Sequence, residues 1–136
     1  MPAGDRGATG GRGRRRRAAG RCLDDPHSAS ADDTQPVIWD CTGAPNQRWT
    51  RTGNTLQIFG KCLDAPIGAA AGARVVLWEC NGGTNQQWTV GTDGTIRGVA
   101  SGLCLDVVDG LVNTANGTLV GLWTRNGQAN QVRTRR

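Results

Sequence analysis

Apolar residues come in short runs along this chain, each bounded by glycine, asparagine, aspartate or proline. Runs such as Val37-Ile38-Trp39, Leu56-Gln57-Ile58 and Val75-Val76-Leu77-Trp78 are β-branched or aromatic, which favours strands of about four or five residues. The alanine run Ala69-Ala70-Ala71 is bracketed by glycines, so it is predicted as a loop. The pattern predicts an all-β fold without helices of useful length.

One unit of about 40 residues occurs three times in the chain. Each copy opens on Cys-Leu-Asp, continues with an apolar residue followed by tryptophan, and closes on Asn-Gln. The openings begin at Cys22, Cys62 and Cys104. Because one such unit cannot bury its own apolar face, three units are expected to close around a shared core. The repeats predict threefold closure, with lobes at residues 22–61, 62–103 and 104–136.

Length and composition fit one small domain that is rich in turns. The chain has 136 residues, with 21 glycines, five tryptophans, one phenylalanine and no tyrosine. Its net charge is +5, but seven arginines lie in residues 1–21, where Asp5 is the one acidic residue. We therefore expect a basic disordered tail at residues 1–21 and a nearly neutral folded domain at residues 22–136. The run Arg14–Arg17 keeps open salt-sensitive nucleic-acid binding as an alternative function.

The number and spacing of the cysteines indicate the cellular compartment of the protein. Two evenly spaced pairs, Cys22 with Cys41 and Cys62 with Cys80, favour disulfides and an oxidising environment in so small a domain. Cys104 is left over, and an exposed thiol there could also link two chains. No apolar stretch approaches the roughly 20 residues of a membrane span, and no secretion signal is visible. We expect a secreted protein, with no membrane partner, whose sequence is a fragment or has a miscalled start.

The repeated motifs carry a resemblance to a known family. The order Cys-Leu-Asp, then Leu-Trp-x-Cys, then Asn-Gln-x-Trp closely resembles the ricin B-chain type lectins over residues 22–136. The resemblance is to the actinobacterial type known as carbohydrate-binding module family 13. It implies a β-trefoil whose three lobes can each present a shallow sugar pocket, often appended to a secreted glycoside hydrolase. It further implies non-catalytic binding of galactose- or xylose-containing poly- or oligosaccharides.

Each lobe then offers four candidate carbohydrate-binding residues. An aspartate could accept hydrogen bonds from two sugar hydroxyls or cap a turn, and the resemblance favours the sugar. A tryptophan that follows a core residue faces outward, where stacking on the apolar face of a pyranose ring is favoured over simple packing. The asparagine donates and accepts, and the glutamine is expected to brace the aspartate. The candidates are Asp24, Trp39, Asn46 and Gln47; Asp64, Trp78, Asn85 and Gln86; and Asp106, Trp123, Asn130 and Gln131.

The lobes also depart from the family pattern. Many family members place a glutamine two residues before the outward tryptophan. Those positions here are Val37, Val76 and Gly121. One sugar hydrogen bond is therefore expected to be missing in every lobe.

The departures rank the three lobes. In the third lobe Arg125 replaces the second cysteine and Arg133 replaces the core tryptophan that the others have at Trp49 and Trp88, so this lobe is expected to be the loosest. Arginines precede Cys22, so the opening strand of the first lobe is expected to be missing. The second lobe is therefore expected to hold the best-preserved pocket.

The residue inventory argues against an enzyme. The one histidine is His27 and the one glutamate is Glu79, while the aspartates recur as repeat features. Cysteines and histidine do not stand at metal-ligand spacing, so neither a metal nor a cofactor is expected. A degenerate trefoil kept as a structural or protein-interaction module remains an alternative function. The sequon Asn116-Gly117-Thr118 is interpreted as a turn rather than a glycosylation site.

Overall fold

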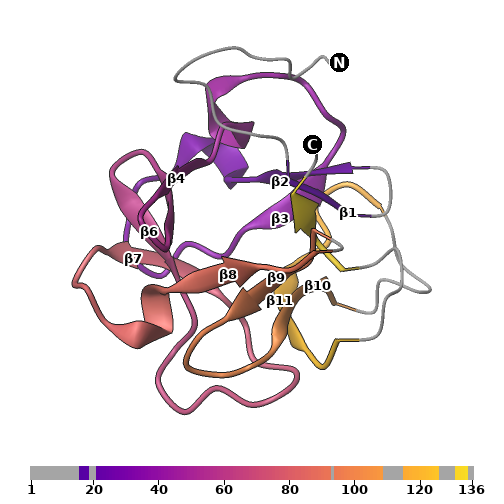
Figure 1. Ribbon diagram of the computed structural model, residues 1–136. Helices are drawn as coiled ribbons and strands as arrows, with labels where there is room; N and C mark the ends of the chain where they lie inside the picture. Colours follow the sequence, from indigo (N-terminus) through magenta and orange to yellow (C-terminus); the bar gives the residue numbers. More distant parts are fainter. Residues whose placement is uncertain (1–15, 19–20, 93, 109–114, 126–130, 135–136) are drawn as a thin grey trace.

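The computed structural model describes residues 16–18, 21–92, 94–108, 115–125 and 131–134 (Figure 1). The strands are β1 Arg16–Ala18, β2 Arg21–Asp24, β3 Val37–Trp39, β4 Thr50–Thr52, β5 Thr55–Ile58, β6 Lys61–Asp64, β7 Val76–Glu79, β8 Trp88–Val90, β9 Ile96–Gly98, β10 Cys104–Val107, β11 Val120–Trp123 and β12 Arg133–Thr134. Three short 3-10 turns are η2 Pro26–Ser28, η3 Pro45–Gln47 and η4 Thr84–Gln86. These ranges contain no α-helix, so the predicted all-β class is confirmed, with strands slightly shorter than expected.

Three four-stranded antiparallel sheets correspond to the three repeats. Their strand orders are β12-β1-β2-β3, β4-β5-β6-β7 and β11-β10-β9-β8. Equivalent residues share one register, since Asp24 pairs with Val37, Asp64 with Val76 and Asp106 with Gly121. The repeat in the sequence is thus a repeat in space. Figure 1 shows the three sheets grouped around a common centre.

The core draws equivalent residues from every lobe. Leucines of the Cys-Leu-Asp motif and the residues before the outward tryptophans are fully buried, because alternate residues of a strand face opposite sides. Trp49 and Trp88 are buried to 0% and 1% exposure, and their indole N–H groups donate to Leu23 O and Leu63 O at 3.1 and 3.0 Å. The predicted core role of both tryptophans is confirmed. Truncating either one should cost about 3–5 kcal/mol of stability.

Backbone hydrogen bonds join each lobe to the next. Leu77 N donates to Thr34 O at 2.7 Å, which attaches the first-lobe loop to the second lobe. Leu122 N donates to Ala73 O at 2.8 Å, and Ile38 N donates to Thr118 O at 2.9 Å. Every lobe thus contributes one loop to its neighbour, and the third lobe closes the ring on the first.

The first lobe has an opening strand, so the expectation that it lacks one is wrong. In strand β1, Arg17 pairs with Cys22 of β2 and with Arg133 of β12. Strand pairing uses backbone groups, so β1 forms between β2 and β12 although its own sequence lacks the apolar pattern of Leu56-Gln57-Ile58. The first sheet therefore begins within the segment 1–21. Residues 1–15 lie outside the described residues, and the disordered tail remains a prediction there.

The predicted disulfides are present. Cys22 is linked to Cys41 and Cys62 to Cys80, each with a Cα–Cα distance of 5.1 Å. Each should stabilise the fold by about 3 kcal/mol in the chain-entropy account. Cys104 is a free thiol as predicted, and it is fully buried, so it does not offer the exposed thiol that a link between two chains would need. Its side chain occupies the inward position that Cys22 and Cys62 occupy in the other lobes.

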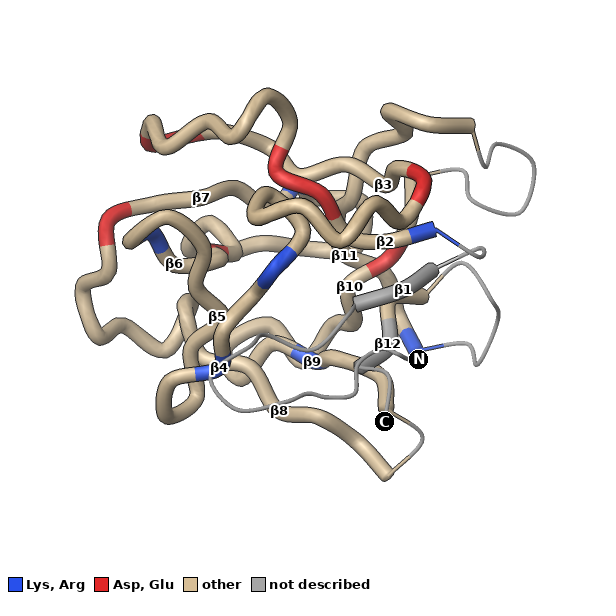
Figure 2. Tube along the Cα trace, turned by 90° about the horizontal axis from the view of Figure 1, so that it is seen from above, with Lys and Arg blue, Asp and Glu red and all other residues tan. Residues whose placement is uncertain are grey.

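Charged residues of both signs occur on all three sheets (Figure 2). Ion pairs join Arg21 to Asp40, Lys61 to Asp32 and Arg74 to Asp33. The last two link the first-lobe loop to the second lobe. Within the described ranges there is no helix of the length and apolarity needed to cross a bilayer.

Candidate functional site

The predicted glutamine brace is present in all three lobes. Each glutamine amide donates to Oδ2 of the motif aspartate, and the pairs are Gln47–Asp24 at 2.8 Å, Gln86–Asp64 at 2.8 Å and Gln131–Asp106 at 3.1 Å. The aspartates come from strands β2, β6 and β10. Each amide nitrogen also donates to a backbone carbonyl, at Asp40, Glu79 and Thr124 respectively. In each lobe one buried glutamine side chain thus links the aspartate carboxylate to the backbone carbonyl of Asp40, Glu79 or Thr124.

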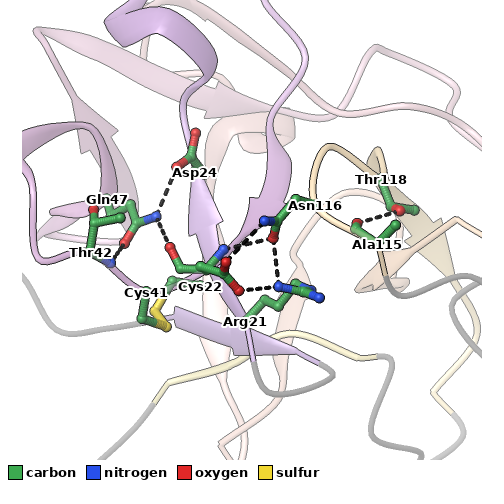
Figure 3. Close-up of polar contacts among 10 residues, drawn as sticks. Arg21, Cys22, Asp24, Cys41, Thr42, Gln47, Ala115, Asn116 and Thr118 are labelled. Atoms are coloured by element: carbon green, nitrogen blue, oxygen red, sulfur yellow. Dashed lines mark hydrogen bonds and ion pairs between the residues drawn. A yellow bond between two sulfur atoms is a disulfide. The ribbon is translucent and has the colours of Figure 1, made fainter.

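The glutamines are buried supports. Gln47, Gln86 and Gln131 have exposures of only 4%, 0% and 0%. Gln47 Oε1 accepts from Thr42 N at 2.8 Å, and Gln86 Oε1 accepts from Asn81 N at 2.9 Å. Figure 3 shows Gln47 held between Thr42 and Asp24, beside the Cys22–Cys41 disulfide. The glutamine therefore holds Oδ2 of the motif aspartate in one position.

The motif aspartates are largely buried, with exposures of 5% for Asp24, 6% for Asp64 and 7% for Asp106. Burial raises the pKa of Asp24, and hydrogen bonding to Gln47 and Asn46 and the nearby His27 oppose the rise. In the second lobe Asn85 Nδ2 donates to Asp64 Oδ1 at 3.2 Å. Two candidate residues of this lobe, Asp64 and Asn85, are therefore in direct contact.

The outward tryptophans are exposed side chains, one in each lobe. Trp39, Trp78 and Trp123 are 44%, 40% and 47% exposed, while the residues before them are buried, as predicted. A loop of the neighbouring lobe borders two of the rings. A Cβ atom added to Gly117 would lie 3.8 Å from Trp39, and one added to Gly72 would lie 3.8 Å from Trp123. The neighbouring lobe therefore forms part of the surroundings of the Trp39 and Trp123 rings.

In the first lobe the predicted residues line one open pocket of about 510 Å³. Asp24, Trp39 and Asn46 all contribute, whereas Gln47 stands behind Asp24. The remaining lining residues are Pro26, His27, Val37, Thr42, Ala44 and Gly117. Sequence reasoning missed His27 and Gly117 as site residues. His27 occurs once and has no repeat partner, and Gly117 belongs to another lobe.

The third lobe is less completely described. Asp106 and Gln131 are bonded to each other, and the Trp123 ring is exposed. Asn130 lies outside the described residues, and so does the side chain of Arg133. Arg125 lines a separate pocket of about 260 Å³ together with Arg97 and three threonines of the β8–β9 hairpin.

Asp25 is a further polar residue that the sequence did not single out. Its side chain has 0% exposure, and neither carboxylate oxygen has a hydrogen-bond partner in the described part of the chain. Burial, with a smaller contribution from the charge of Asp24, raises the pKa of Asp25 to about 7. The equivalent residues in the other lobes are the buried apolar Ala65 and Val107. Asp25 therefore lies where the other lobes continue their core.

Comparison with known proteins agrees with the threefold arrangement. The chain is similar to the designed threefold-symmetric protein ThreeFoil, with 26% identity and a TM-score of 0.75 over 88% of this chain and 95% of that chain. A non-toxic homologue of type II RIPs from Momordica charantia, in complex with α-methyl-D-galactoside, is 27% identical with a TM-score of 0.71. That match covers 82% of this chain but 42% of the bitter gourd chain.

An enzyme also contains a similar module. The exo-β-1,3-galactanase 1,3Gal43A from Clostridium thermocellum is 25% identical with a TM-score of 0.70, over 90% of this chain and 29% of that chain. Residues 11–132 match the family model described as the ricin-type beta-trefoil lectin domain. The chain therefore belongs to the ricin-type β-trefoil lectin family.

Proposed function

We propose that this protein binds galactose- or xylose-containing glycans without transforming them. Membership of the lectin family supports carbohydrate binding. The observation that carries the proposal is the first-lobe pocket, where the exposed Trp39 ring stands in the same pocket as the braced carboxylate of Asp24. An exposed indole stacks on the apolar face of a pyranose, and a fixed carboxylate accepts hydrogen bonds from its hydroxyls.

We propose that each of the three lobes provides a weak carbohydrate-binding site. In the second lobe Asp64, Trp78 and Gln86 repeat the braced aspartate and exposed ring of the first lobe, and Asn85 donates to Asp64. In the third lobe Asp106, Trp123 and Gln131 do the same, and Asn130 is included by sequence alone. Several weak sites on one rigid body gain apparent affinity for a polysaccharide that reaches more than one of them. Multivalency therefore suits a polymeric ligand.

The module is further proposed to act outside the cell, attached to or alongside a glycoside hydrolase. Two disulfides and a lectin fold are consistent with an extracellular location. The similarity to a segment of a galactanase supports a role in holding such an enzyme on its substrate. We propose no catalytic role for this chain itself.

The test is titration calorimetry with methyl galactoside and with xylo-oligosaccharides, set beside DNA binding over a salt series. We expect saturable sugar binding that disappears in a variant with Trp39, Trp78 and Trp123 all changed to alanine. Circular dichroism must show that this variant is folded. Absence of binding to both sugar types would overturn the proposed ligand class. Binding to DNA alone, with a steep loss at higher salt, would favour the basic-segment alternative instead.

A further inference from the structure

We propose that His27 is a ligand-contacting residue of the first-lobe pocket, which donates a hydrogen bond to a sugar hydroxyl bound at Asp24. The inference rests on the proposed carbohydrate binding and adds a residue that determines which sugar the first lobe selects. His27 lines the same pocket as Asp24, Trp39 and Asn46. Its imidazole lies close enough to Asp24 to influence that carboxylate electrostatically.

The turn that carries His27 is hydrogen-bonded to Asn46, one of the candidate site residues. Asp25 N donates to Asn46 O at 2.9 Å, and Asn46 Nδ2 donates to Asp25 O at 3.2 Å. Ser28 N also donates to Asp25 O, at 3.1 Å. Because the same carbonyl holds both Asn46 and the turn, the backbone of the turn is held beside the pocket. The His27 side chain is exposed, so its imidazole is accessible to a ligand there.

The backbone of this turn is specialised relative to the second lobe. His27 and Ser28 adopt left-handed conformations with φ of 59° and 53°. The equivalent segment of the second lobe is Pro66-Ile67-Gly68, where the positive φ falls on glycine and Ile67 is 91% exposed. Left-handed conformations are unfavourable for residues other than glycine, and they concentrate where a side chain has to be aimed. The first lobe thus uses a strained turn to present an imidazole.

His27 adds a donor to a pocket whose other side-chain donors are the Thr42 hydroxyl, the Trp39 indole N–H and the Asn46 amide. When ionised, Asp24 only accepts hydrogen bonds. Pro26, Val37 and Ala44 form an apolar part of the pocket wall. The Asn46 amide already donates to Asp25 O. A sugar hydroxyl donates to a carboxylate and accepts from a second group. His27 provides an N–H donor whether its ring is neutral or charged.

The experiment isolates the first lobe within the full-length chain. Trp78→Ala and Trp123→Ala together remove the exposed rings of the other two lobes, and methyl galactoside and a xylo-oligosaccharide serve as probes. In this background His27→Gly removes the imidazole but relieves the left-handed backbone. His27→Asn keeps a donor and tolerates the same backbone. Ile67→Gly is the matched control at the equivalent turn of the second lobe.

We expect His27→Gly to weaken binding of the better probe about tenfold, the effect of one hydrogen bond, with His27→Asn restoring most of the loss. Ile67→Gly should leave the affinity within about twofold. Unchanged affinity in His27→Gly, with the parent protein still binding sugar, overturns the role of His27 alone. If the parent binds neither probe, the first lobe is no site for these sugars, and both the role of His27 and the proposed function of this lobe fail. If His27→Asn loses as much affinity as His27→Gly, the effect does not come from a donated hydrogen bond, and the role of His27 as a donor is wrong.

Discussion

Gln86 donates one hydrogen bond to Asp64 Oδ2 at 2.8 Å and a second to the backbone oxygen of Glu79 at 2.9 Å. Its Oε1 accepts from Asn81 N at 2.9 Å, and the side chain is fully buried. The carboxylate is therefore oriented before any ligand arrives, which reduces the entropy lost on binding. The same residue couples pocket geometry to the stability of the lobe.

Gln86→Leu should consequently reduce both stability and sugar affinity. Leucine removes three hydrogen bonds and takes away the buried amide that donates to Asp64 Oδ2. The expected loss in the free energy of unfolding is about 3 kcal/mol, measured by denaturant unfolding. The control is Gln87→Leu, because the Gln87 amide makes a long contact of 3.5 Å at the surface. Similar losses in the two variants would show that the brace has no special role.

Trp78→Ala should lower glycan affinity more than Trp123→Ala. The second lobe keeps its disulfide and its core Trp88, and Asn85 donates to Asp64. The third lobe has the free Cys104 in place of a cross-link. We expect a loss of about 1–3 kcal/mol in binding free energy at the second site and a small loss at the third, by calorimetry on folded variants. Equal losses would mean that the pocket residues matter more than lobe integrity.

Thiol labelling should distinguish Cys104 from the other cysteines. Its full burial predicts that a thiol reagent reacts with the native protein very slowly and with the denatured, non-reduced protein at one site. Reduction of the denatured protein should then expose the four cysteines of the two disulfides. Mass spectrometry counts the labels. Rapid native labelling, or a disulfide-linked dimer in thiol-blocked samples, would contradict the burial of this side chain.

Features that repeat along the chain were the ones predictable from sequence. The alternation of Leu77 and Trp78 specifies which residue enters the core and which faces out, because a strand has a period of two. The threefold recurrence of aspartate and glutamine predicted the Gln86–Asp64 contact. Such features are encoded locally and recur in every lobe, so the fold class and the contact between aspartate and glutamine could be predicted from them.

Features that depend on the packing of one lobe against another, or that occur once in the chain, could not be predicted from the sequence. Strand β1 forms because β12, from the far end of the chain, pairs with it, and no local pattern reports that pairing. Gly117 approaches Trp39 for the same reason, since the third-lobe loop packs against the first lobe. His27 and Asp25 break the repeat, and a single departure from a pattern does not show whether the residue faces solvent, pocket or core.

The burial of Asp25 predicts that acid stabilises the first lobe relative to neutral pH. Its pKa rises from the ordinary value of 3.8 to about 7 in the folded protein, so between these values the folded state holds a proton that the unfolded state has released. The free energy of unfolding should therefore fall as pH rises from about 4 to about 7. Asp24, whose pKa is also raised, contributes in the same direction.

Asp25→Ala should flatten this dependence and stabilise the protein at pH 7 by about 1–3 kcal/mol, because it removes a buried carboxylate without partners. Alanine is the residue that the second lobe carries at the equivalent Ala65, which is buried to 3% exposure. The reverse change, Ala65→Asp, should introduce the same pH-dependent loss into the second lobe. Denaturant unfolding at pH 4, 5.5 and 7 measures both variants. If Asp25→Ala is less stable than the parent at pH 7, the carboxylate has a stabilising partner in solution, and the proposed origin of the pH dependence is wrong.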